Sequence, residues 1–181
     1  YNLEPEAPLY YVSMPSPPLD ASNRAFVAAL VDLVRESGVQ LIIIDNLGLI
    51  CGNADENSAE MAKVMGNLRY LSEESHAAVV VVHHQRKSTG IDTRRGEMLR
   101  GHSSIEAALD LALLVERVED TDNVTVTPTK SRGYAVKPFG AMFTYEHKAG
   151  TRDMAAARFF SEPIMNAEDK KRAEIEDAVL D

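Results

Sequence analysis

The 181-residue sequence contains no tryptophan and a single cysteine, Cys51. One cysteine excludes a disulfide within the chain, and the sequence lacks the local cluster of cysteine and histidine that a structural zinc site needs. It also lacks an apolar stretch of about 20 residues, the length of a membrane-spanning helix, and any secretory leader. We therefore expect a cytoplasmic protein without a membrane partner.

Positive charge is in short supply as well. Lysine and arginine number 19 against 28 aspartate and glutamate residues, a net charge of −9. The chain as a whole is therefore not a general nucleic-acid binder, and any contact with a polyanion must come from a local basic patch. With 45% hydrophobic residues, the chain can bury one core. It begins at Tyr1, not at a methionine, and we expect a piece of a longer protein.

Apolar spacing predicts alternating strands and helices. Apolar side chains recur at helical spacing over residues 24–37, with Ser22 or Asn23 as the cap and Gly38 as the stop. Strands are expected at residues 9–12, 41–45, 78–83 and 111–116, and further helices at 58–75, with Asn57 and Glu60 as a capping pair, and at 103–109. This order predicts an α/β fold with a mostly parallel sheet, whose continuous apolar strands are covered by helices on both faces.

Beyond residue 116 the pattern changes. Residues 124–129, 142–145 and 158–160 favour antiparallel strands, and residues 169–180 a charged terminal helix. We expect one domain over residues 1–165 and a helix or tail over 166–181. Ligands of parallel sheets lie off the carboxyl ends of the strands, so the residues at those ends are the first candidates for a site.

Asp45 ends the apolar run 41–44. A carboxylate at this position must face a ligand or be paired, and a contact to magnesium through water would satisfy it. The alternative is a carboxylate that caps the following loop through backbone amides.

His83 and His84 follow the next strand, where one of them can hydrogen-bond a terminal phosphate. Adjacent residues of a strand point to opposite faces, so only one can face the site. The alternative is a histidine hydrogen-bonded at the end of its strand.

Two groups of cations complete the candidates. The stretch 86–100 combines Arg86, Lys87, Arg94, Arg95 and Arg100 with Asp92 and Glu97, a surplus of three positive charges. A loop of this kind can follow a phosphate backbone, although it is equally a solvated loop with scattered charge. Lys130 and Arg132 are two residues apart, which on an extended segment places both cations on one side, and Gly133 permits a sharp turn after them.

Taken in order, four strings resemble the RecA-like hexameric helicase ATPases of the P-loop NTPase superfamily, especially the plasmid RepA type and more distantly the DnaB type. The strings are Leu41–Leu47, Val82–Lys87, Leu99–Ser104 and Lys130–Gly133. The resemblance implies a RecA-like core, ATP and magnesium as cofactors, a homo-oligomeric ring and single-stranded DNA as partner. It implies that Asp45 is the Walker B acid, that His84 is the γ-phosphate sensor, and that Lys130 and Arg132 reach the neighbouring subunit's nucleotide. The basic stretch falls where such proteins contact nucleic acid.

Two parts of that family's site are absent from the sequence. No glycine is followed by lysine, so there is no G-x-x-x-x-G-K-[ST] loop for the phosphates, and the strand-ending catalytic glutamate is missing too. We therefore expect these 181 residues alone not to hydrolyse ATP, and the sheet to compensate for the missing strand by re-pairing residues 111–116 or by dimerisation. Three alternatives remain: a non-catalytic RecA-like regulator or scaffold, a recombination-type ATPase, and a DNA-binding protein independent of nucleotide.

Overall fold

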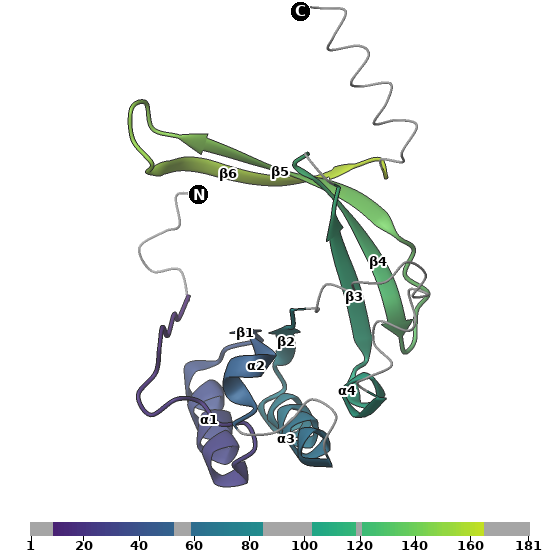
Figure 1. Ribbon diagram of the computed structural model, residues 1–181. Helices are drawn as coiled ribbons and strands as arrows, with labels where there is room; N and C mark the ends of the chain where they lie inside the picture. The colour runs from purple at the N-terminus through teal and green to yellow at the C-terminus, as the bar shows by residue number, and fades with distance from the viewer. Residues whose placement is uncertain (1–8, 53–58, 85–102, 119–120, 165–181) are drawn as a thin grey trace, which may run out of the picture. The chain divides into compact units, whose positions relative to one another are not determined.

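The computed structural model describes residues 9–52, 59–84, 103–118 and 121–164 (Figure 1). These residues form two compact units, one ending at Leu109 and the other beginning at Asp110. The elements are α1 (Arg24–Ser37), β1 (Leu41–Asp45), α2 (Leu47–Ile50), α3 (Ala59–Ser75), β2 (Ala78–Val82), α4 (Ser103–Ala108), β3 (Leu111–Arg117), β4 (Asn123–Ser131), β5 (Phe139–His147) and β6 (Met154–Glu162). The predicted combination of helices, parallel strands and later antiparallel strands is thereby confirmed, but the described strands form two separate sheets, one parallel and one antiparallel.

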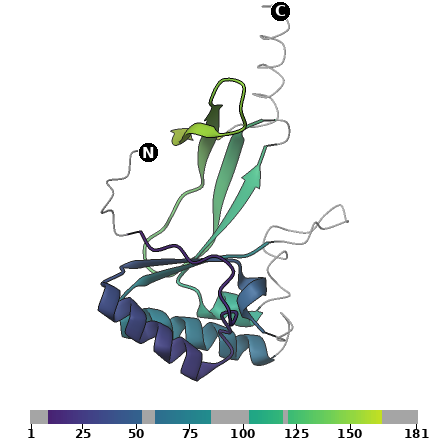
Figure 2. The same cartoon turned by 90° about the vertical axis from the view of Figure 1, so that its left-hand side faces the viewer.

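The first unit is built on the parallel pair β1–β2. The register runs from Leu41 opposite Ala78 to Asp45 opposite Val82. Figure 2 shows α1 and α3 side by side along one face of this pair. Ile44 of β1 is buried with Val31 of α1 and Leu71 of α3 in a single hydrophobic core. The helices therefore hold the two strands from one side.

Both ends of α1 follow from local chemistry. The side chain of Asn23 accepts hydrogen bonds from the backbone nitrogens of Ala25 and Phe26, at 3.0 and 3.3 Å. Gly38 ends the helix with φ of 67°, a left-handed conformation that glycine adopts without the cost of a Cβ. The predicted helix, with its cap and its stop, is confirmed.

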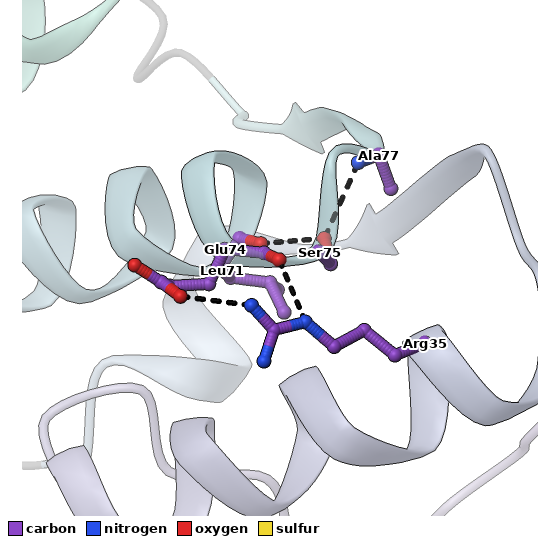
Figure 3. Close-up of polar contacts among 5 residues, drawn as sticks. All are labelled: Arg35, Leu71, Glu74, Ser75 and Ala77. Atoms are coloured by element: carbon purple, nitrogen blue, oxygen red, sulfur yellow. Dashed lines mark hydrogen bonds and ion pairs between the residues drawn. The ribbon is translucent and has the colours of Figure 1, made fainter.

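The C-terminus of α3 is fastened to α1 by Arg35 (Figure 3). Its Nε donates to the backbone oxygen of Glu74 and its Nη2 to the Glu74 carboxylate, both at 2.8 Å. The Ser75 hydroxyl donates to the oxygen of Leu71 and accepts from the nitrogen of Ala77. The carbonyl of Glu74, one of the four that the helix end leaves unpaired, is thus satisfied by a side chain of α1.

The second unit is an antiparallel sheet in the order β3-β4-β5-β6. Val124 and Val126 of β4 and Ala141 of β5 are buried in it. Phe143 of β5 packs on Phe159 of β6, with their ring centroids 4.6 Å apart. The antiparallel strands expected after residue 116 are present and longer than predicted.

Four predictions about the fold are wrong. Residues 9–12 form no strand and their side chains are exposed, because no strand pairs with them in the described structure. Residues 111–117 belong to the antiparallel sheet, since they pair with β4; the expected re-pairing into the parallel sheet does not occur. The sequence predicts a polar loop over residues 48–56, but residues 48–50 belong to the short helix α2 (Leu47–Ile50).

The fourth error concerns burial of the parallel strands. Leu41, Ile43 and Val80 are 53%, 65% and 48% exposed. They alternate along their strands with Ile42, Ile44, Val79 and Val81, which face the helices. Among the described residues, helices cover only one face of the parallel pair. The continuous apolar runs of β1 and β2 therefore do not mean that both faces of these strands are buried.

Candidate functional site

Asp45 and His84 lie at the same edge of the parallel pair. Asp45 is the last residue of β1 and stands opposite Val82, the last residue of β2; His83 and His84 follow directly. Carboxyl ends of parallel strands meet at one edge, so the pairing places Asp45 and the two histidines at the same edge of the sheet. Asp45 and His84 are exposed, whereas His83 is half-buried. An exposed carboxylate can hold a hydrated cation, and an exposed imidazole can donate a hydrogen bond from its ring N–H to a phosphate.

The segment after Asp45 turns at once into α2. The Asp45–Asn46 peptide bond is cis. Asn46 is the N-cap residue of α2, and its side chain makes no capping hydrogen bond. Leu47 and Ile50 of α2 are buried in the core, so the short helix anchors the chain directly behind Asp45.

A second anchor for this edge comes from the residues before α1. The nitrogen of Ala21 donates to the oxygen of Ile50 at 2.8 Å, and the nitrogen of Ser22 donates to the Asp20 carboxylate at 2.9 Å. Hydrogen bonds from the side chain and the backbone of Ser22 hold the pKa of Asp20 below its ordinary value. The Asp20 carboxylate is thus bound within its own turn.

In the second unit, Lys130 lies near the end of β4 and Arg132 directly follows this strand. Lys130 lies opposite Ala112, and Ser131 opposite Leu111. The backbone nitrogen of Arg132 donates to the oxygen of Asp110 at 2.7 Å, and its guanidinium Nη1 lies 3.5 Å from Asp110 Oδ1. Ala112 and Asp110 are alternate residues, so both cations lie on one side of the sheet. Gly133 follows with φ of 105°.

The remaining predicted residues fall outside the described part of the chain: Arg86, Lys87, Arg94, Arg95 and Arg100, together with Asn57 and the tail 166–181. In the described ranges, no group of three or more His, Cys, Asp or Glu side chains is arranged to hold a metal ion. A magnesium ion at Asp45 would take one carboxylate contact and complete its shell with water and phosphate oxygens, as magnesium commonly does. None of the helices within the same ranges has the length and apolarity to cross a membrane.

The ion pair between Asp110 and Arg132 was not predicted from the sequence. Asp110, the carboxylate beside Arg132, is separated from it by 22 positions, and only the register of β3 and β4 makes them neighbours. The only sequence pattern at Asp110 is the apolar run that follows it. This pattern does not indicate which strand pairs with residues 111–117.

A family model matches much of the first unit. Residues 2–90 match the family model of an AAA domain. The match includes Asp45 and His84 and ends before Lys130 and Arg132. It supports a P-loop, AAA-like ATPase family, and with it an ATPase-type function that uses nucleotide and magnesium. A search of curated proteins finds no match.

Proposed function

We propose that this chain is part of an ATP-driven DNA motor of the RecA-like, RepA type that hydrolyses ATP between subunits of a ring. The observation that carries the proposal is the AAA-domain match over residues 2–90, which includes the strand edge that carries Asp45 and His84. In this proposal residues 1–165 make up the ATPase domain and residues 166–181 a terminal helix or tail.

Each residue has one role in the proposed site. Asp45 holds magnesium through water, because a carboxylate leaving an apolar strand is suited to a hydrated cation. His84 contacts the terminal phosphate of the same nucleotide. Lys130 and Arg132 serve the nucleotide of the neighbouring subunit, where positive charge stabilises the transferring phosphoryl group. The basic side chains Arg86, Lys87, Arg94, Arg95 and Arg100 contact the backbone of single-stranded DNA.

ATP hydrolysis by the full-length product of the gene that encodes this chain tests the proposal. We expect magnesium-dependent turnover that Asp45→Asn lowers by more than tenfold and that Arg132→Ala lowers by about 1,000-fold, the lower end of the effect of an arginine acting on phosphoryl transfer. Arg117→Ala is the matched control, because Arg117 is an exposed arginine of the same sheet paired with Asp122 at 3.0 Å. Turnover that survives both substitutions would refute the assignment.

Mixing two inactive variants tests whether the site is shared between subunits. In a ring, an Asp45→Asn subunit still supplies Arg132, and an Arg132→Ala subunit still supplies Asp45. A random mixture should therefore regain roughly a quarter of wild-type turnover if neighbouring copies share a site through a head-to-tail interface. A mixture as inactive as its components would place all these residues at one subunit's own nucleotide. Absence of magnesium-ATP binding by the unsubstituted protein would favour a non-catalytic scaffold instead.

A further inference from the structure

Arg132 carries an ion pair that extends the ladder between β3 and β4. These strands run side by side in Figure 1, and Leu111 stands opposite Ser131. The next position along the same register pairs Asp110 with Arg132, and the 2.7 Å hydrogen bond from Arg132 N to Asp110 O continues the ladder there. Opposite charges directly across an antiparallel pair attract, so the two side chains meet, with Nη1 and Oδ1 3.5 Å apart.

A bulge at Thr129 creates this pairing. Pro128 lies opposite Leu113 and Lys130 opposite Ala112, so Thr129 has no partner residue on β3. Its hydroxyl instead donates to the oxygen of Ala112 at 3.4 Å. In a regular ladder from Pro128 onward, Arg132 would face Leu109 in place of Asp110. The bulge therefore shifts the end of β4 by one residue and aims Arg132 at a carboxylate.

Arg132 contacts Asp110 through its backbone and through its side chain, and a phosphate can replace only the side-chain contact. The backbone hydrogen bond is short and directly follows the last pair of the sheet, so it fixes the position of the Arg132 backbone. The ion pair is solvent-exposed, with 47% of the Arg132 side chain and 73% of the Asp110 side chain accessible. Exposed pairs contribute little to stability, and a phosphate offers a guanidinium two oxygens and more negative charge than one carboxylate. A phosphate can therefore displace Asp110 without disturbing the sheet.

We propose that Asp110 is a positioning residue that holds the Arg132 guanidinium when no phosphate is present and competes with the terminal phosphate of a nucleoside triphosphate for it. This inference rests on the proposed function, in which Arg132 contacts a nucleotide. Neutralising Asp110 removes the competitor while the backbone hydrogen bond stays, so Arg132 remains in place and becomes more available to phosphate.

Equilibrium binding of a slowly hydrolysed thiophosphate analogue of ATP, with magnesium, to the full-length gene product tests the inference. Asp110→Asn should tighten binding about fivefold, which corresponds to about 1 kcal/mol, and should leave the thermal midpoint of unfolding unchanged. Asp122→Asn is the matched control, since Asp122 also pairs with an exposed arginine of this sheet. It should leave the affinity at the wild-type value. Asp110→Ala should act in the same direction as Asp110→Asn.

The double variant separates positioning from a general charge effect. With Arg132→Ala present, adding Asp110→Asn should change affinity less than twofold. Fivefold tightening that persists without Arg132 would overturn the inference, because the gain would then come from removing one negative charge anywhere near the ligand. Unchanged or weaker binding by Asp110→Asn, beside a loss in Arg132→Ala, would overturn the inference and leave the proposed function standing. Unchanged binding by Arg132→Ala would overturn both the inference and the role of Arg132.

Discussion

The side-chain amide of Asn67, in the middle of α3, donates a 2.8 Å hydrogen bond to the backbone oxygen of Ala21, two residues before the cap of α1. Asn67 is only 5% exposed. Its Oδ1 accepts a hydrogen bond from Arg24 at 3.2 Å, and the Arg24 guanidinium lies 3.1 Å above the centre of the Tyr70 ring. One amide therefore joins the start of α1 to α3 with both its donor and its acceptor in use.

Asn67→Leu should lower the free energy of unfolding by about 2 kcal/mol, because it leaves the buried oxygen of Ala21 without a donor. Urea denaturation monitored by circular dichroism measures the change. Lys63→Ala is the control: Lys63 is an exposed residue of the same helix, and its loss should stay within about 0.5 kcal/mol. An Asn67→Leu protein as stable as the wild type would show that apolar packing replaces the amide's hydrogen bonds.

Asp20→Asn should destabilise the protein near neutral pH and lose its effect in acid. The hydrogen bonds from Ser22 lower the pKa of Asp20 in the folded state, so the stabilisation is present above the unfolded value, about 3.9. It is lost as pH falls from there through the lowered folded pKa. Urea midpoints of both proteins should therefore differ at pH 6 and converge once the pH has fallen below the lowered folded pKa of Asp20. Asp32→Asn, an exposed change on α1, controls for the loss of one charge.

Gly140→Ala and Gly66→Ala should change stability in opposite directions. A Cβ on Gly140 would lie 2.5 Å from the oxygen of Glu162 and 2.6 Å from that of Pro163, so β5 and β6 would have to separate. We expect a loss of about 1–3 kcal/mol. Gly66 lies on the exposed side of α3 with open space around it, and alanine there should add about 0.5–1 kcal/mol through helix propensity. Urea unfolding of both variants gives the sign directly; two losses would contradict the steric explanation.

Arg35→Ala should cost more than Glu74→Gln, although both remove the same ion pair. The alanine variant also removes the donor to the Glu74 backbone oxygen, worth about 1 kcal/mol, whereas the glutamine variant keeps it and loses only an exposed charge pair, worth about 0.5 kcal/mol. The difference should persist in 1 M sodium chloride, where the exposed charge pair is screened. Equal losses at high salt would show that the backbone contact contributes nothing.

The elements predicted from the sequence are those whose signals are local. The asparagine cap, apolar stripe and glycine stop of α1 lie within 16 consecutive residues and needed no tertiary information. The position of Asp45 and the histidines at one edge of the sheet followed from one topological rule for parallel strands. Residues 9–12 and 111–116 were misassigned because an apolar run does not specify whether, or with which strand, it pairs. The position of Asp110 beside Arg132 could not be predicted from the sequence, because it depends on a bulge in the register of β3 and β4.

The bulge at Thr129 also determines how sequences should be compared with this one. Because Thr129 opposes no residue of β3, a homologous chain that lacks this position can keep Lys130 opposite Ala112 and Arg132 opposite Asp110. A deletion of Thr129 would therefore leave the positions of Lys130 and Arg132 relative to β3 unchanged. The same deletion at Ser131 would turn the arginine to the other side of the sheet. Two sequence alignments that place a one-residue gap at Thr129 or at Ser131 would therefore score almost equally. Only the first keeps the arginine on the same side of the sheet as Asp110.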